Sequence, residues 1–142
     1  MVMQTIELRR SIRKYTSEPV SQELLDNLLQ MAERTQTMGN LQLYSVVVTR
    51  EAEMKAKLAP CHFNQPMVTE APVVLTFCAD YHRTTRWCEE RQADAGYDNM
   101  LSFMNAATDA LLYCQTFCNL AEEKGLGLCF LGTTIYQPRQ II

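Results

Sequence analysis

Four cations and a hydroxyl lie within six residues near the start of the chain, in the segment Arg9-Arg10-Ser11-Ile12-Arg13-Lys14. A phosphate ester carries about −1.5 to −2 charges and three acceptor oxygens, which guanidinium groups and a hydroxyl can bind together. A solvated basic face is the commoner role of such a run of charges. This cation segment, residues 9–14, is therefore a candidate phosphate site, with a solvated surface as the alternative.

The second candidate is the glycine segment, residues 125–132 with the sequence GLGLCFLG. Its spacing matches neither GxGxxG nor GxxxxGK[ST], and it follows a predicted helix, so neither a dinucleotide-binding fold nor a P-loop is indicated. Its glycines would end that helix and let a flat ligand approach the backbone near Gly132. The alternative is a helix cap followed by a core strand over 126–131.

The chain contains six cysteines and two histidines. They form no CxxC pair, no HExxH motif and no second cysteine pair at ligand spacing, so we expect no metal site. A cysteine nucleophile would need a nearby base, which the sequence does not place, and a GxSxG motif is absent. We therefore expect buried free thiols and no catalytic side chain, with the difficult chemistry left to a cofactor.

Helices and strands must position these candidate groups. The predicted elements are helices over 21–34, 51–59 and 97–124, and interior strands over 43–49, 73–79 and 126–131. Ser21 is a typical N-cap for the first helix, and β-branched residues favour the strands. The helix over 97–124 has no Gly or Pro and is apolar on more than one face. It should therefore pack against two partners, of which one could be another subunit.

Composition limits the class of protein. The 142 residues are 47% hydrophobic and 20% charged, as in one soluble globular domain. The net charge of −3 gives no cationic field for nucleic acid, and no apolar run suits a membrane span. The N-terminus does not resemble a signal peptide, which favours a cytoplasmic protein. Pro138 should open a helix that the chain barely continues, so we expect residues 1–142 to be a single domain of a longer, C-terminally truncated protein.

The segment Arg10-Ser11-Ile12-Arg13-Lys14-Tyr15, followed by Glu18-Pro19-Val20, closely resembles the opening R-S-x-R-x-[FY]…P[VI] of the nitroreductase family of flavin-dependent NAD(P)H oxidoreductases. Three later segments agree with that family in order and spacing. TMGNLQLY over 37–44 is similar to [ST]-x-x-N-x-Q-x-[WY], Asn64-Gln65 precedes an apolar strand, and residues 125–132 resemble the late glycine segment. Together these motifs span nearly the whole chain.

The resemblance implies an α+β fold with a mainly antiparallel central sheet flanked by helices. It also implies an obligate homodimer with FMN in each of two interface clefts. The residues that would hold the FMN phosphate are Arg9, Arg10, Ser11 and Arg13. Those that would approach the flavin from the other subunit are Gln36, Thr37 and Met38, in a loop shaped by Asn40. Those beside the flavin are Leu131, Gly132 and Thr133, with Gln65 bonded to the polar edge of the ring or to the ribityl chain.

The implied mechanism is ping-pong hydride transfer. NAD(P)H reduces FMN at N5 and leaves, and a nitroaromatic, quinone or related oxidant then takes its place. This chemistry demands no side-chain acid or base. Two other classes remain open, a flavin-free dimerising α+β module and a thiol- or metal-binding protein that uses the cysteines.

Overall fold

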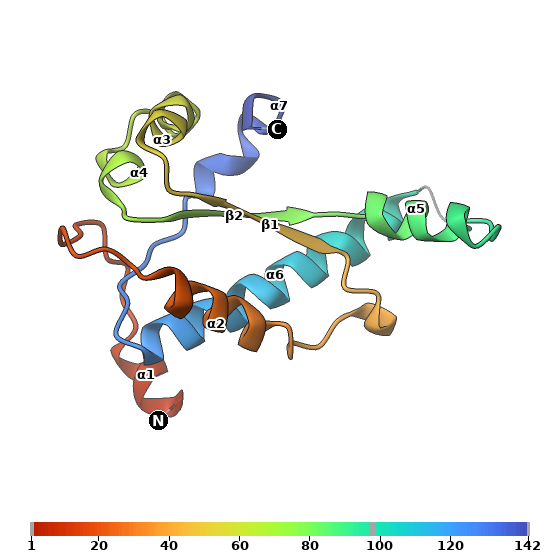
Figure 1. Cartoon of the computed structure of the whole chain (residues 1–142), viewed down its shortest axis with the longest axis horizontal. Coiled ribbons are helices and arrows are strands. Elements are labelled where there is room, and N and C mark those ends of the chain that lie inside the picture. Colours follow the sequence, from red (N-terminus) through yellow and green to blue (C-terminus); the bar gives the residue numbers. More distant parts are fainter. Residues whose placement is uncertain (1, 97–98, 142) are drawn as a thin grey trace.

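The computed structural model describes residues 2–96 and 99–141, in which helices surround a small antiparallel sheet (Figure 1). In chain order the elements are α1 (Val2–Leu8), α2 (Gln22–Ala32), η1 (Met38–Asn40), β1 (Tyr44–Thr49), α3 (Ala52–Leu58), η2 (Ala59–His62), α4 (Pro66–Glu70), β2 (Val74–Ala79), α5 (His82–Glu90), α6 (Met100–Glu123), η3 (Gly132–Ile135) and α7 (Pro138–Ile141). Helices and strands share one core in this arrangement, which is the predicted α+β class.

Helix α2 begins as its sequence predicts. The Ser21 side chain accepts a hydrogen bond from the Leu24 backbone N–H at 3.1 Å, an N-cap contact that stabilises a helix by about 1 kcal/mol. Leu25, Leu28 and Ala32 are buried along one stripe of the helix. The helix ends at Ala32, slightly before the predicted end.

Strands β1 and β2 pair antiparallel, with Tyr44 opposite Ala79 and Thr49 opposite Val74. Both strands lie within their predicted ranges, but the expectation that they are interior strands is wrong. The described sheet has two strands, so each has one unpaired edge, and Val47 of β1 is 54% exposed. Helix α6 packs against the sheet across both strands (Figure 1).

Helix α6 is the longest described element and confirms the long helix predicted over 97–124. Residues 97 and 98 of that prediction lie outside the described residues. Tyr113, Phe117 and Ala121 of α6 join the buried side chains of α2 in the hydrophobic core. The apolar side chains that α6 leaves exposed are Met100, Leu101, Phe103, Met104, Leu111 and Leu112. The helix is therefore apolar on more than one face, as predicted.

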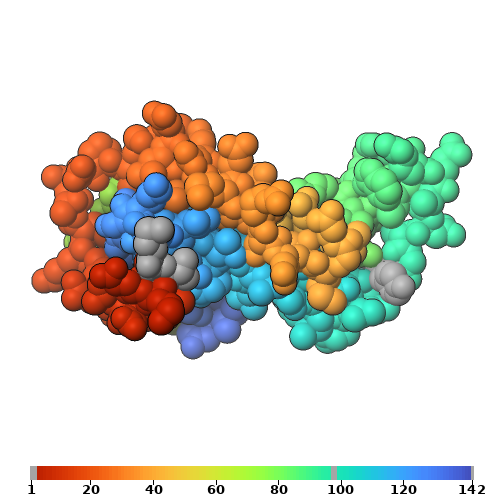
Figure 2. Space-filling view, turned by 90° about the horizontal axis from the view of Figure 1, so that it is seen from below, coloured from red at the N-terminus to blue at the C-terminus, as the bar shows by residue number. Residues whose placement is uncertain are grey.

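The strand predicted over 126–131 is wrong, because this segment joins no sheet. Its Leu128 carbonyl accepts a hydrogen bond from Ile12, whereas the N–H groups of residues 127–131 donate to no described residue. An extended segment becomes a strand only with a neighbouring ladder. Three α-helices, α1, α4 and α5, were not predicted. Figure 2 shows the region of α5 standing apart from the main body, and α5 has no buried residue.

All six cysteines are free, and Cys61, Cys114 and Cys118 are buried. Within residues 2–96 and 99–141, no cluster of three or more His, Cys, Asp or Glu side chains could hold a metal ion. Across the same residues, none of the helices combines the length and the apolar character of a membrane span.

Candidate cofactor site

The cation segment is joined to the glycine segment through Ile12. The Ile12 backbone N–H donates to the Leu128 carbonyl oxygen at 2.9 Å. A Cβ atom on Gly127 would lie only 2.9 Å from three atoms of the Ile12 side chain. Real Cβ atoms do not approach that closely, so any larger residue at position 127 would force the two segments to shift relative to each other.

Tyr15 makes a second set of contacts that hold the cation segment in place. Its hydroxyl donates to the Ile12 carbonyl oxygen at 3.0 Å and lies 3.6 Å from the Cys129 sulfur. Burial, followed by the contact with Cys129, raises the pKa of Tyr15 above its ordinary range, so the phenol remains protonated and able to donate. The backbone of the cation segment is therefore held in place by neutral groups, which leaves its charged side chains available.

The charged side chains of the cation segment face solvent. Arg9, Arg10 and Arg13 are exposed, as is the hydroxyl-bearing Ser11. Neither ion pair found among the described residues involves them. Several guanidinium groups without a counter-charge in one short segment favour the binding of an external anion.

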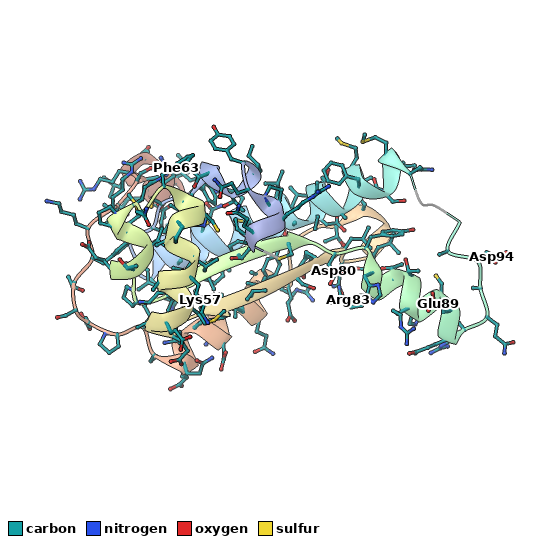
Figure 3. The ribbon with its side chains drawn as sticks, turned by 90° about the horizontal axis from the view of Figure 1, so that it is seen from above. Lys57, Phe63, Asp80, Arg83, Glu89 and Asp94 are labelled. Carbon is teal, nitrogen blue, oxygen red and sulfur yellow. The ribbon has the colours of Figure 1, made fainter. Side chains whose placement is uncertain are left out.

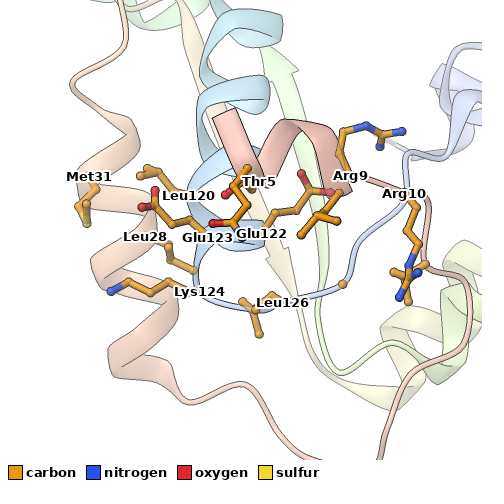
Figure 4. A pocket seen from close by; sticks show the side chains of 15 residues that line it. Thr5, Arg9, Arg10, Leu28, Met31, Leu120, Glu122, Glu123, Lys124 and Leu126 are labelled. Carbon is orange, nitrogen blue, oxygen red and sulfur yellow. The ribbon is translucent and has the colours of Figure 1, made fainter. Parts of the chain in front are cut away.

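An open hollow of about 710 Å³ adjoins the cation segment, and Arg9 and Arg10 stand at one end of it (Figure 4). The carboxyl-bearing residues Glu122 and Glu123 also line the hollow, whereas Arg13 does not. Lys124 lines the hollow as well, but two carboxylates repel a phosphate at close range. The hollow itself is therefore poorly suited to a phosphate, and the exposed side chains of the cation segment suit it better.

At the end of the candidate site away from the cation segment, a buried histidine contacts both Gln65 and Thr133. His62 is 4% exposed, and its Nδ1 atom lies 2.7 Å from the Thr133 hydroxyl. Its carbonyl oxygen accepts a hydrogen bond from the Gln65 N–H at 3.1 Å. Burial lowers the pKa of His62 below 6.5, which favours the neutral imidazole. His62 thus connects Gln65 and Thr133, two residues that the sequence analysis implicates separately.

The glycine segment connects the two ends of the candidate site. Figure 1 shows it running from the end of α6 past the sheet to η3. A Cβ atom on Gly132 would meet no heavy atom within 4 Å, so the backbone is open there, as the approach of a flat ligand requires. The predicted site residues that lie on or beside this path are Arg9, Arg10, Ser11, Arg13, Gln65, Leu131, Gly132 and Thr133.

The other four predicted site residues, Gln36, Thr37, Met38 and Asn40, lie elsewhere. Their loop follows α2, and Figures 1 and 2 show it well separated along the long axis from the cation segment. One chain alone does not bring the two groups together. The Thr37 hydroxyl is buried without a hydrogen-bond partner among the described residues.

Three residues that the sequence analysis does not assign to the site support its geometry. Gly127 has a signal in the sequence, since a glycine two residues after Gly125 suggests a close approach of backbone. His62 and Asp109 have none, because a lone histidine or acid carries no spacing pattern. Asp109 is 0% exposed and accepts hydrogen bonds from the loop that contains Met38.

Known proteins are similar to this chain along most of its length. The sequence profile of the Nitroreductase family matches residues 6–138, and the chain therefore belongs to the nitroreductase family. The resemblance found in the sequence is confirmed.

Two relatives from Bacillus subtilis (strain 168) are similar along most of the chain. The protein named FMN reductase (NADPH) is 33% identical over 132 residues, which cover 92% of this chain and 53% of that protein. The one named FMN reductase [NAD(P)H] is 32% identical over 146 residues, which cover 99% of this chain and 57% of that protein. The chain thus spans about half the length of the curated relatives it matches.

A crystal structure of a protein from Bacteroides fragilis NCTC 9343 is 60% identical, with a TM-score of 0.97 over 99% of this chain and 57% of that chain. The α+β fold of the family is therefore present in the described residues.

Proposed function

We propose that this protein is an FMN-dependent NAD(P)H oxidoreductase. The observation that carries the proposal is the cation segment, whose backbone is fixed by Ile12 and Tyr15 while its charged side chains remain exposed and unpaired among the described residues. The names of the two B. subtilis relatives support FMN and NAD(P)H as the ligands. The open backbone at Gly132 and the unpartnered Thr37 hydroxyl fit a bound cofactor.

Each end of the candidate site has a separate task. The guanidinium groups of Arg9, Arg10 and Arg13, with the Ser11 hydroxyl, neutralise and bind the phosphate of FMN. At the other end, Leu131, Gly132 and Thr133 lie along the flavin. Gln65 donates or accepts a hydrogen bond at the polar edge of the ring or at the ribityl chain.

FMN, when bound, supplies hydride-transfer chemistry at N5, with NAD(P)H and an oxidant such as a nitroaromatic or quinone using the same cleft in turn. The residues of this chain bind and orient the cofactor, and the hydride transfer itself demands no side-chain acid or base. His62 positions Thr133 through its 2.7 Å contact.

The protein acts as a homodimer in this proposal. The exposed apolar side chains of α6 would be covered by a second copy, since an exposed apolar surface of this kind usually marks an interface. Pairing would also bring Gln36, Thr37 and Met38, in the loop shaped by Asn40, to the flavin of the other subunit. The free cysteines fit a cytoplasmic protein.

Substitution of one cation tests the proposal. Arg13→Glu places a like charge beside the phosphate and should weaken FMN binding at least about tenfold, or about 1.4 kcal/mol. Lys57→Glu is the matched control, because it makes the same change in net charge at an exposed residue of α3, whose side chain is 63% exposed. Flavin fluorescence quenching measures both affinities. Equal affinities for the two variants would remove the cation segment from the site.

A further inference from the structure

A single buried carboxylate holds both ends of the loop over residues 38–43. Asp109 of α6 is 0% exposed. Its Oδ1 atom accepts a hydrogen bond from the Met38 N–H at 2.8 Å, and its Oδ2 atom accepts one from the Leu43 N–H at 3.1 Å. Because the two donors are the first and last residues of the loop, the position of Asp109 sets the separation between the loop's ends.

The backbone of this loop needs such support. Gly39, Asn40 and Gln42 have φ values of 57°, 57° and 53°. Glycine and asparagine tolerate this left-handed conformation, whereas glutamine rarely adopts it. A backbone of this kind persists only where its surroundings hold it.

The hydrogen bonds that join this loop to the β2–α5 region lie only at its C-terminal end. The Gln42 carbonyl oxygen accepts hydrogen bonds from the Arg83 guanidinium and from the Tyr44 N–H, and the Leu43 carbonyl oxygen accepts one from the Asp80 N–H. Figure 3 shows Asp80 and Arg83 together where β2 leads into α5. The Asn40 N–H donates to the carbonyl oxygen of Thr37, just before the loop, at 3.4 Å. Among the described residues, Asp109 is the one hydrogen-bond partner from another part of the fold for the backbone of residues 38–41.

While the backbone N–H groups at the loop ends turn inward, several side chains of the loop and its approach remain outside. Gln36 and Asn40 are exposed, and Met38 is 46% exposed. The loop is therefore anchored from beneath and open on its outer side, which is the arrangement that a pre-shaped binding loop requires.

We propose that Asp109 is a positioning residue that fixes this loop in the shape in which Gln36, Met38 and Asn40 meet the flavin of the partner subunit. This inference rests on the proposed function. Asp109 touches neither the flavin nor the substrate in it and acts only through the backbone of Met38 and Leu43.

The two hydrogen bonds from Met38 and Leu43 to Asp109 are called the clamp below. Two variants weaken it, one by changing the acceptor and the other by removing a donor. Asp109→Asn keeps the size of the side chain but turns one acceptor oxygen into an NH₂ donor, which faces a backbone N–H. Met38→Pro removes the first of the two donors instead. Proline suits this site because Met38 opens η1 and Thr37 before it is extended, with φ −134° and ψ 161°.

Matched controls separate the clamp from other effects. Ser102→Ala removes another buried polar group of α6, and the Ser102 hydroxyl has no partner among the described residues. Met38→Ala removes the Met38 side chain while it keeps the N–H.

The experiment measures amide hydrogen exchange by NMR together with FMN affinity by fluorescence quenching. Asp109→Asn should speed exchange at Met38 and Leu43 at least about tenfold, leave the Leu28 amide of α2 unchanged, and weaken FMN binding about tenfold. Ser102→Ala should change none of these. Met38→Pro should weaken FMN binding more than Met38→Ala does, and adding Asp109→Asn to it should cause little further loss.

Three results would overturn the inference. Unchanged exchange at Met38 and Leu43 in Asp109→Asn would show that the carboxylate does not hold the loop. Equal acceleration at Leu28 would show general destabilisation, and faster loop exchange with unchanged FMN affinity would restrict Asp109 to folding. If the unmodified chain binds no FMN, the proposed function fails and the flavin role of Asp109 fails with it, while exchange still shows whether the clamp exists.

Discussion

Replacing Gly127 by alanine tests whether the cation segment depends on close contact with the glycine segment. The new Cβ would lie 2.9 Å from three Ile12 atoms, whereas carbon atoms in contact are normally about 3.5–4.0 Å apart. Ile12 must therefore move by roughly 0.6 Å or more, and overpacking of this kind costs about 1–3 kcal/mol. The movement also strains the 2.9 Å hydrogen bond from the Ile12 N–H to the Leu128 carbonyl oxygen.

One effect opposes this loss. Alanine has less conformational freedom than glycine in the unfolded chain, which stabilises a protein by about 0.4–1 kcal/mol where the native backbone allows it. The steric term is the larger, so we predict that Gly127→Ala lowers the free energy of unfolding by about 1–2 kcal/mol and also weakens FMN binding. Urea denaturation measures the first effect and flavin fluorescence the second.

Gly132→Ala provides the matched control. A Cβ there meets nothing within 4 Å, and the backbone does not have a positive φ. The free energy of unfolding should therefore stay equal or rise slightly, while FMN binding weakens because the new methyl group occupies space along the flavin. If Gly127→Ala is as stable as Gly132→Ala, the contact between Ile12 and Gly127 does not constrain the fold and our reasoning is refuted.

Two further predictions concern His62 and α6. Burial lowers the pKa of His62 below 6.5, so the unfolded chain takes up a proton more readily and stability should fall as the pH drops from about 6.5 toward the lowered pKa of the folded state. His62→Asn should reduce the change in the urea midpoint of unfolding between pH 7 and pH 5. A variant whose midpoint changes with pH as much as that of the unmodified chain would contradict this. Leu111→Glu places a charge on the apolar face of α6, where Leu111 is 70% exposed. It should dissociate the proposed dimer without unfolding the chain, because a buried unpaired carboxylate is costly at an interface. Sedimentation velocity measures the mass, and a variant that stays dimeric would remove Leu111 from the interface.

Much of the secondary structure could be predicted because its signals are local. Ser21 caps α2 through a contact three residues along the chain. The absence of glycine and proline from 97–124 indicates a long helix, and β-branched residues indicate β1.

Prediction from the sequence fails where a segment carries no reliable local signal. Residues 126–131 have the composition of a strand but bond to Ile12 instead of a neighbouring strand. Helix α5 has the polar sequence HRTTRWCEE and buries no residue, so apolar periodicity cannot reveal it.

The candidate site also combines features that are visible in the sequence with features that depend on tertiary contacts. The cation segment is visible in the sequence because its charges are consecutive. The contact of Ile12 with Gly127 joins residues more than a hundred positions apart, and the contacts of Asp109 with Met38 and Leu43 cross from one element to another. Such pairs follow from tertiary packing, which no local pattern encodes.

The affinity of the protein for FMN relative to riboflavin tests the central claim most directly, since riboflavin lacks only the phosphate. Hydrogen bonds to a charged group contribute about 1.5–3 kcal/mol each, so two of them give a preference of at least about 100-fold. We predict that FMN binds at least about 100-fold more tightly than riboflavin, and that Arg13→Glu removes most of this preference while Lys57→Glu keeps it. Equal affinity for the two flavins would contradict a phosphate site at the cation segment.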